Sequence, residues 1–143
     1  MNYYVLDTDH ISILQRESEP AFSRLSARLT RCSPDLILVT IVSFHEQFQG
    51  WMSLLNQASS IAELIVAYRK MEELLRFFSK SQVLPYDKKA ADTLEELKRQ
   101  RIRIGTLDLR IASIVLSENA ILLTRNRRDF EKVPNLRIED WTI

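Results

Sequence analysis

The sequence Tyr3-Tyr4-Val5-Leu6-Asp7-Thr8-Asp9, close to the N-terminus, predicts the first strand and the turn that follows it. Tyr3 to Leu6 is an apolar, β-favouring run without polar alternation, which is typical of a strand buried on both faces. The run stops at Asp7, and Asp9 is the expected N-cap of a helix that begins directly afterwards. A carboxylate at the carboxyl end of a buried parallel strand lies where open α/β sheets bind their ligands.

The rest of the chain alternates in the same way between short apolar runs and amphipathic segments. Further strands are expected at 36–40, 83–84, 120–124 and 136–138. Helices are expected at 11–16, 20–31, 43–55, 61–78, 88–101 and 107–118, with a short helical turn at 126–130. Short apolar strands alternating with helices imply an α/β fold, in which helices cover both faces of a parallel sheet of four to five strands.

Two helix starts carry a capping signal. Ser43 is the expected N-cap of one helix, and Glu46 three residues later completes a capping box. Thr106 is the expected N-cap of the helix that follows Gly105. The helices at 43–55 and 61–78 should pair as a hairpin with apolar surface to spare, which includes the side chains of Phe48, Trp51, Leu54 and Leu55.

Length and composition limit the class of protein. At 143 residues with 45% hydrophobic and 27% charged residues, we expect one globular domain spanning residues 1–143. No apolar run approaches the roughly 20 residues that span a bilayer, and no signal-peptide pattern opens the chain, so a cytoplasmic, non-membrane protein is expected. Cys32 is the only cysteine, which excludes an internal disulfide and a cysteine-rich metal site.

Several catalytic motifs are excluded by the residue inventory. Gly50 and Gly105 are the only glycines, so the chain has neither a dinucleotide fingerprint, nor a phosphate-binding P-loop, nor a serine nucleophile elbow. His10 and His45 lack the spacing of metal ligands and are expected to cap or pack. Carboxylates therefore remain as the candidate chemistry.

Polar side chains follow three of the expected strands or open a helix. Asp7 ends the first strand, Glu46 lies one turn into the helix after the second, Asp108 lies in a first helical turn, and Asn126, with Asp129 nearby, follows the strand at 120–124. Each of these residues taken alone has a purely structural interpretation, as a turn residue, a helix cap or a partner of the helix dipole. Because the carboxyl ends of parallel strands meet at one edge, we expect these side chains to converge there.

Clustered acids favour a hard cation. Mg²⁺ and Mn²⁺ take oxygen ligands and keep waters that a substrate phosphate can displace. Acids packed together without a cation repel one another and their pKa values rise, so such a cluster indicates a metal site.

Basic residues are unevenly distributed although the net charge is only +1. They form two clusters, Lys98, Arg99, Arg101, Arg103 and Arg110 in the first and Arg125, Arg127 and Arg128 in the second. Either cluster could be a solvated helix end, and becomes a nucleic-acid contact only if the fold brings it beside the acids.

Four ordered motifs resemble the PIN-domain family, and specifically its VapC-type toxins of bacterial toxin–antitoxin pairs. They are Tyr4-Val5-Leu6-Asp7-Thr8-Asp9, Val39-Thr40-Ile41-Val42-Ser43-Phe44-His45-Glu46, Ile104-Gly105-Thr106-Leu107-Asp108-Leu109-Arg110-Ile111-Ala112, and the block from Leu123 to Trp141. The resemblance covers nearly the whole chain. It implies a three-layer PIN-like sandwich and a metal-dependent ribonuclease.

The resemblance also implies roles for single residues. Asp7, Glu46 and Asp108 would form the acidic metal site for Mg²⁺ or Mn²⁺, with Asp7 and Asp108 as the direct ligands. Thr8 and Thr124 match the supporting hydroxyl groups of the family. The fourth acidic position of many relatives is occupied here by Asn126, which carries no charge and argues against a second tightly held ion; Asp9 and Asp129 are candidates to compensate.

The implied partners are RNA, an antitoxin and a second copy of the chain. Arg110, Arg125, Arg127 and Arg128 would border the cleft and contact the RNA backbone. A cognate antitoxin would wrap the helical hairpin and place a basic or bulky side chain in the acidic cleft. The apolar hairpin surface makes a homodimer physically reasonable.

Two other functions stay open on the sequence alone. Asp7-Thr8-Asp9 after a strand has the D-x-D spacing of haloacid-dehalogenase-type phosphatases, although no suitably placed lysine stands out. The neutral Asn126 leaves room for a PIN-like module that binds RNA or protein without cutting.

Overall fold

A five-stranded parallel sheet forms the centre of the computed structural model, which describes residues 1–143. Its strands lie in the order β3-β2-β1-β4-β5, so the N-terminal strand is central. They are β1 (Tyr4–Leu6), β2 (Ile37–Thr40), β3 (Val83–Leu84), β4 (Ile121–Leu123) and β5 (Arg137–Glu139). Within the sheet, Val5 lies between Leu38 of β2 and Leu122 of β4. The predicted parallel α/β sheet is confirmed.

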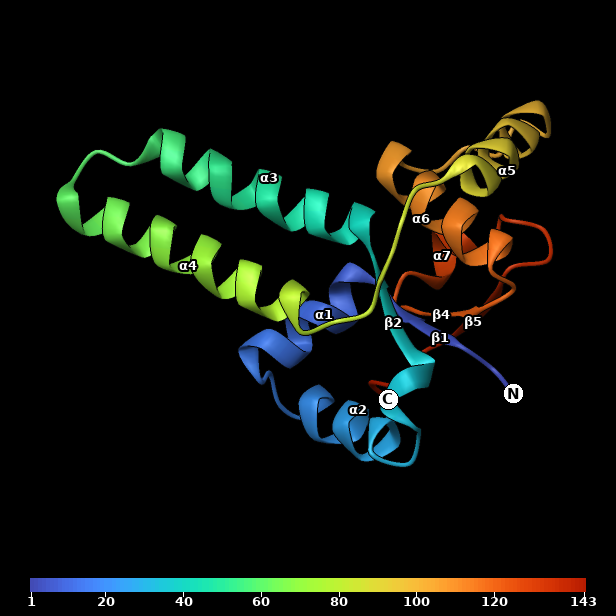
Figure 1. Ribbon diagram of the computed structural model, residues 1–143, viewed down its shortest axis with the longest axis horizontal. Coiled ribbons are helices and arrows are strands. Elements are labelled where there is room, and N and C mark those ends of the chain that lie inside the picture. Colours follow the sequence, from blue (N-terminus) through green and yellow to red (C-terminus); the bar gives the residue numbers. More distant parts are fainter.

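Seven α-helices connect or follow these strands (Figure 1). They are α1 (Thr8–Arg16), α2 (Ala21–Leu29), α3 (Ile41–Gln57), α4 (Ile61–Ser79), α5 (Lys88–Arg99), α6 (Thr106–Ser117) and α7 (Arg127–Phe130), and a 3₁₀ turn, η1 (Pro34–Leu36), precedes β2. None of the helices combines the length and the hydropathy that crossing a bilayer requires.

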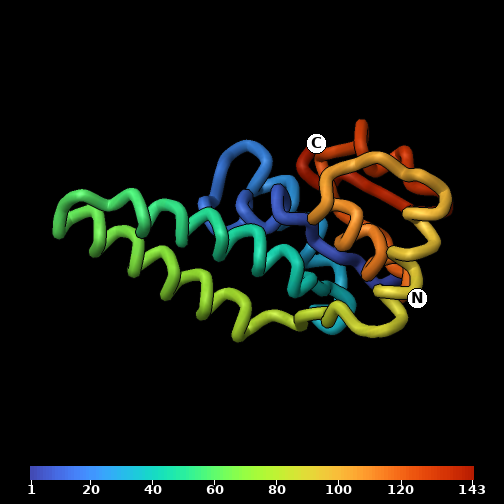
Figure 2. The backbone as a smooth tube through the Cα atoms, turned by 90° about the horizontal axis from the view of Figure 1, so that it is seen from above, coloured from blue at the N-terminus to red at the C-terminus, as the bar shows by residue number.

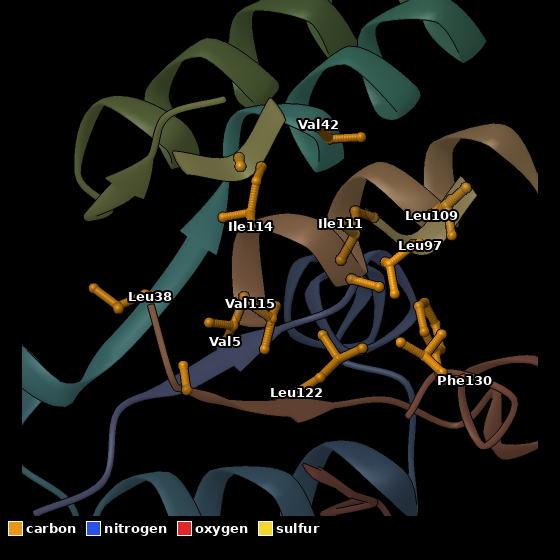
Figure 3. Close-up of a cluster of buried hydrophobic side chains, with 14 residues drawn as sticks. Val5, Leu38, Val42, Leu97, Leu109, Ile111, Ile114, Val115, Leu122 and Phe130 are labelled. Carbon is orange, nitrogen blue, oxygen red and sulfur yellow. The ribbon is translucent and has the colours of Figure 1, made fainter. Parts of the chain in front are cut away.

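Alternate strand residues enter two separate cores, one on each face of the sheet. Val5 and Leu122 pack with α5, α6 and Phe130 in the first core, part of which Figure 3 shows. Leu6 and Leu123 pack on the other face with α1, α2 and the base of α4. Since successive side chains of a strand point to opposite faces, uninterrupted apolar runs such as Tyr4–Leu6 suit a sheet covered on both sides. The three-layer arrangement is confirmed.

Helices α3 and α4 form the predicted hairpin, which projects as an arm beyond the sheet (Figures 1 and 2). Phe44 and Phe78 hold its base together in an edge-to-face contact, with ring centroids 5.3 Å apart. Of the apolar face expected on α3, Phe48 and Leu54 are exposed, whereas Trp51 is partly buried against the core. Most of the exposed apolar side chains on the arm belong instead to α4, namely Ile61, Leu64, Ile65, Val66, Tyr68 and Leu75.

Three of the predicted helix caps are wrong. Helix α1 begins at Thr8 with Asp7 as its N-cap, so Asp9 lies inside the first turn. Helix α3 follows β2 without a linker, and its N-cap is Thr40, whose hydroxyl accepts the Ser43 N–H. The predicted Ser43–Glu46 capping box therefore does not form.

The third correction concerns α6, where Thr106 is the first helical residue and Gly105 takes the N-cap position without a side-chain hydrogen bond. In all three cases the helix begins one or more residues earlier than predicted. At α1 and α3 the consequence is that Asp9 and Glu46 do not cap their helices and contact other parts of the chain.

Candidate functional site

Asp7 lies at the carboxyl end of the central strand, where the chain turns into α1. Its backbone N–H still belongs to the sheet and donates to the Leu123 carbonyl at 2.9 Å. Its carboxylate is 5% exposed, with Oδ1 accepting the Thr8 N–H at 2.8 Å and Oδ2 accepting the Thr124 hydroxyl at 2.7 Å. Two neighbouring strands, β1 and β4, therefore fix one buried carboxylate.

The environment of Asp7 disfavours its charge. Burial, and then the nearby charge of Asp9, raise the pKa of Asp7 from 3.8 to about 7, and the charge of Asp108 adds to the rise. The hydrogen bonds from Thr124 and Thr8 lower the pKa but do not offset burial. An ionised Asp7 thus lacks a positive partner in the protein.

Glu46 reaches the same edge from the first turns of α3. Its Oε1 accepts the Thr8 hydroxyl at 2.5 Å, and that hydroxyl also lies 3.0 Å from the Ser43 Oγ. Thr8 immediately follows Asp7, so one dipeptide at the end of β1 contacts both β4 and α3 through its side chains. The predicted convergence of Asp7 and Glu46 is therefore observed.

Asp108 completes the group from the first turn of α6. Burial raises the pKa of Asp108 from 3.8 to about 6, and the charges of Glu46, Asp129 and Asp9 contribute to this rise. Helix α6 therefore directs its N-terminus at the acidic edge, which the sequence could not establish. Carboxylates from three other segments, α1, α3 and α7, thus act on Asp108 across a shared space.

Asn126 caps α7 and links two of these acids. Its Nδ2 donates to Asp129 Oδ2 at 3.1 Å and lies 3.4 Å from Asp108 Oδ2, while its Oδ1 accepts the Asp129 N–H at 3.4 Å. A carboxylate at this position could not donate these hydrogen bonds. The neutral amide thus holds Asp108 and Asp129 side by side.

Asp9 has a position that the sequence did not reveal. Its Oδ2 accepts the backbone N–H of Arg125 at 2.9 Å, and its Oδ1 accepts the His10 Nδ1–H at 2.7 Å. The expectation that Asp9 caps a helix is wrong because Asp7 takes the cap position one residue before Thr8. Contacts between residues more than a hundred positions apart have no local signal, so only the fold could show them.

The oxygen-only donors at this edge suit Mg²⁺ or Mn²⁺. No arginine or lysine lies within ion-pair distance of Asp7, Glu46 or Asp108, so their charges are uncompensated by the protein. The side chains are not already drawn together as a three-ligand cage. Glu46 is bonded to Thr8, and Asp108 lies 3.4 Å from the Asn126 amide, so each of these two carboxylates is held by a neutral polar group.

The second basic cluster lies directly beside the acids, on the loop and short helix that follow β4. Arg125, Arg127 and Arg128 project from this segment, and none of them forms an ion pair with an acidic side chain. Arg110, one turn C-terminal to Gly105 on α6, is half-buried and also unpaired. In the first cluster, Arg99 is instead neutralised by glutamates of its own helix.

Two surface hollows adjoin the helical arm, and the acids line neither of them. One of about 530 Å³ opens between α1, α3 and α4, beside Trp51 and Phe77. The other, of about 660 Å³, lies along α4 beside Ile61 and Tyr68. The acidic edge is therefore identified by its charge and its hydrogen bonds, because neither hollow is lined by Asp7, Glu46 or Asp108.

Comparison with known proteins agrees with this geometry. The family profile of the PIN domain matches residues 4–136. Ribonuclease VapC1 of Haemophilus influenzae is 29% identical over 140 residues, covering 97% of this chain and 98% of that protein. Ribonuclease VapC2 of the same species is 36% identical over 112 residues, covering 71% and 83% respectively.

A solved structure shares the fold. The DNA-bound VapBC of Salmonella typhimurium superposes with a TM-score of 0.75 at 26% identity and covers 99% of both chains. The family match spans nearly the whole chain and includes every acid described above. This protein therefore belongs to the PIN domain family, and its similar relatives within that family are named VapC.

Proposed function

We propose that this chain is a divalent-metal-dependent endoribonuclease that hydrolyses RNA phosphodiester bonds as the toxin of a toxin–antitoxin pair. The observation that carries the proposal is the group of uncompensated acids, Asp7, Glu46 and Asp108, at one edge of a PIN-domain sheet. The similar proteins named ribonuclease VapC support RNA cleavage as the reaction. Membership of the PIN domain family leaves the phosphatase alternative without support.

In this proposal Asp7 and Asp108 hold one Mg²⁺ or Mn²⁺, and Glu46 contacts the ion directly or through a water. A bound ion of this kind acidifies a water molecule and neutralises charge that builds on the phosphorus centre. The high pKa values of Asp7 and Asp108 support the assignment, because a cation would supply the positive charge that the protein does not.

The surrounding polar groups orient the acids. Thr124 fixes Oδ2 of Asp7, and Thr8 fixes Oε1 of Glu46, which leaves further oxygen lone pairs to face the shared space. Such hydrogen bonds reduce the rotational freedom that a metal ligand would otherwise lose on binding. Thr8 and Thr124 are thus supporting residues.

Asn126 has the corresponding role for Asp108. Its amide donates toward Asp108 and Asp129 and adds no further negative charge. We therefore assign one tightly held ion to the site, with Asn126 acting in catalysis by holding Asp108.

Arg110, Arg125, Arg127 and Arg128 would contact the RNA backbone on either side of the acids. They are unpaired and lie next in sequence to site residues, so phosphates can replace solvent as their partners. Contacts of this kind provide affinity without reading base sequence.

The arginine contacts predict a change in salt dependence. In an inactive Asp7→Asn background, Arg127→Gln or Arg128→Gln should weaken binding to unrelated single-stranded RNAs by similar factors. Each change should make the slope of log K against log salt shallower by about 0.7, the value expected for one phosphate contact. Fluorescence anisotropy between low and moderate salt measures both quantities.

Arg69→Gln is the matched control, because Arg69 is an exposed arginine on α4, away from the acids. Its salt slope should equal that of the background protein. An unchanged slope for both α7 variants would remove these arginines from the RNA contact.

An antitoxin and a second copy of the chain are the proposed protein partners. Solved structures with this fold include toxin–antitoxin complexes named VapBC. The exposed apolar residues of the arm give such partners an extensive surface to cover, including Ile61, Ile65 and Tyr68 of α4. We place the protein in the cytoplasm, where its RNA substrate and an antitoxin would meet it.

The reaction is tested by removing the metal. The purified chain, incubated with tRNA and with unstructured RNA, should cleave at least one substrate in Mg²⁺ or Mn²⁺. EDTA should stop cleavage, and an excess of Mn²⁺ should restore it, because the acids alone supply no cation. RNA that is bound but stays intact in both metals would instead indicate a non-catalytic binding module.

A further inference from the structure

His10 is fully buried between the acidic edge and the C-terminal segment, and both of its ring nitrogens have a partner. Its Nδ1 lies 2.7 Å from Asp9 Oδ1, and its Nε2 lies 3.2 Å from the backbone nitrogen of Trp141. A backbone N–H can only donate, so Nε2 accepts this hydrogen bond. Asp140 Oδ1 also faces Nε2, but at 3.7 Å, beyond the Trp141 N–H. We therefore assign the ring hydrogen to Nδ1, which donates it to Asp9.

Asp9, held by His10, also contacts the loop after β4. Its second oxygen, Oδ2, accepts the Arg125 N–H at 2.9 Å and lies 3.3 Å from Thr124 Oγ1. The Thr124 hydroxyl in turn contacts Asp7 Oδ2 at 2.7 Å. One continuous chain of polar contacts thus joins Trp141, through His10 and Asp9, to the carboxylate of Asp7.

The His10 contact fixes the orientation of Asp9. No other protein group donates to Asp9 Oδ1, so without the imidazole the carboxylate could rotate away from Arg125. The N–H group that donates to His10 Nε2 belongs to Trp141, whose side chain is fixed by its own contacts. Trp141 is buried, its Nε1 donates to Glu139 at 2.9 Å, and Arg28 stacks over its ring.

We propose that His10 is a positioning residue of the ribonuclease, acting through the hydrogen bond from its Nδ1 to Asp9. This bond holds Asp9, and Asp9 holds Thr124 and Arg125 where Thr124 can orient Asp7. The proposal rests on the proposed function and deepens it, because it makes the C-terminal segment part of the support of the acidic site. A histidine that merely fills the core would not depend on which nitrogen is preserved.

Two substitutions each preserve only one of the two hydrogen bonds that the His10 imidazole makes. In His10→Asn the amide nitrogen can take the place of Nδ1 and still donate to Asp9, but the Trp141 contact is lost. In His10→Gln the longer side chain brings its amide oxygen to the place of Nε2, where it keeps the Trp141 contact but loses the contact to Asp9. Both variants lose one hydrogen bond and the aromatic ring, so both should melt at a lower temperature.

The first readout is hydrogen exchange of the Arg125 amide in the metal-free protein, measured by NMR. His10→Gln should speed this exchange at least tenfold relative to amides of the β4 core, while His10→Asn stays close to the unsubstituted protein. The second readout is RNA cleavage in Mn²⁺. His10→Gln should lower kcat by about 10-fold, the lower end of the range for groups that orient metal ligands, because His10 acts on Asp7 through Asp9 and Thr124, and His10→Asn should retain most of the activity.

Asp9→Ala provides a check that first leaves His10 in place. It should reproduce the fast Arg125 exchange, and His10→Gln should add nothing to it, because both changes break the same chain of contacts. Additive effects would overturn the proposal. Equal losses of activity in His10→Asn and His10→Gln that follow their melting temperatures would likewise reduce His10 to a packing residue.

Failure of the proposed function gives a different result. If the unsubstituted chain cleaves no RNA, the ribonuclease assignment fails, and the exchange rate of Arg125 still decides whether His10 holds Asp9. Slow exchange in His10→Gln would show that it does not.

Discussion

Asp7→Asn is expected to lower kcat/KM for metal-dependent RNA cleavage by about 10³-fold or more while the protein stays folded. Each tenfold loss corresponds to about 1.4 kcal/mol, and a bound ion contributes several kcal/mol to stabilising charge at phosphorus. An amide is a poor ligand for a hard cation and cannot neutralise it. Measuring cleavage over a range of Mn²⁺ concentrations distinguishes lost metal binding from lost chemistry.

The fold should tolerate this substitution for a specific reason. The Asn oxygen can still accept the Thr8 N–H, and its NH₂ group can donate to Thr124 Oγ1, whose own hydrogen can turn to Asp9 at 3.3 Å. At pH 8, where Asp7 is ionised, the variant also removes a buried charge that has no partner, so its melting temperature without metal should rise.

Asp35→Asn is the control, because Asp35 is an exposed aspartate in η1. It should leave cleavage unchanged. If purified Asp7→Asn cleaves RNA as fast as this control, Asp7 is not part of the active site.

The second large effect is a fall in the stability of the metal-free protein as pH rises. The pKa of Asp7 is about 7 in the folded protein and 3.8 for an unperturbed aspartate, so the folded state binds more protons between these values. The contribution of Asp7 to stability therefore decreases as the pH rises above 4, by an amount on the order of 4 kcal/mol at full ionisation. The raised pKa of Asp108 acts in the same direction, with a smaller effect because this side chain is partly solvated.

Metal binding should reverse this trend. A ligand carboxylate must be deprotonated, so Mn²⁺ should stabilise the protein more at pH 8 than at pH 5. Urea unfolding at both pH values, with Mn²⁺ or with EDTA, measures the effect. The comparison is made with Asp7→Asn, because subtracting its curve cancels the titration of all other groups.

In Asp7→Asn, the free energy of unfolding measured in EDTA should depend less on pH, and Mn²⁺ should stabilise the protein much less. If the metal-free, unsubstituted protein gains stability relative to Asp7→Asn between pH 4 and pH 7, the buried, uncompensated carboxylate described above does not exist in solution.

Much of the fold could be predicted because its strands carry a strong local signal. Runs such as Tyr3–Leu6 and Leu36–Thr40 have no polar alternation, and a sheet with two covered faces buries successive residues within them, such as Val5 and Leu6. The helix starts were less predictable. At Thr40 the strand passes straight into α3, so the cap is the last strand residue and not the hydroxyl residue three positions later.

The convergence of the acids followed from topology once the parallel sheet was predicted. Asp7 and Asn126 follow neighbouring strands, and Glu46 follows β2 on the other side of β1. The position of Asp108 depended on the direction of α6, and the contact of His10 with Trp141 joins residues 131 positions apart. No spacing pattern encodes such contacts, so the sequence showed the acids and not the groups that hold them.

Anomalous diffraction from a crystal soaked in Mn²⁺ near pH 8 would show whether Asp7 and Asp108 share a metal ion. The predicted result is one strong Mn²⁺ peak at the carboxyl edge of the sheet, within about 2.0 to 2.3 Å of oxygens from Asp7 and Asp108. Glu46 would contact the same ion directly or through one water. A Mn²⁺ ion bound elsewhere, with Asp7 and Asp108 uncoordinated in crystals of a protein that cleaves RNA in the same buffer, would contradict the account.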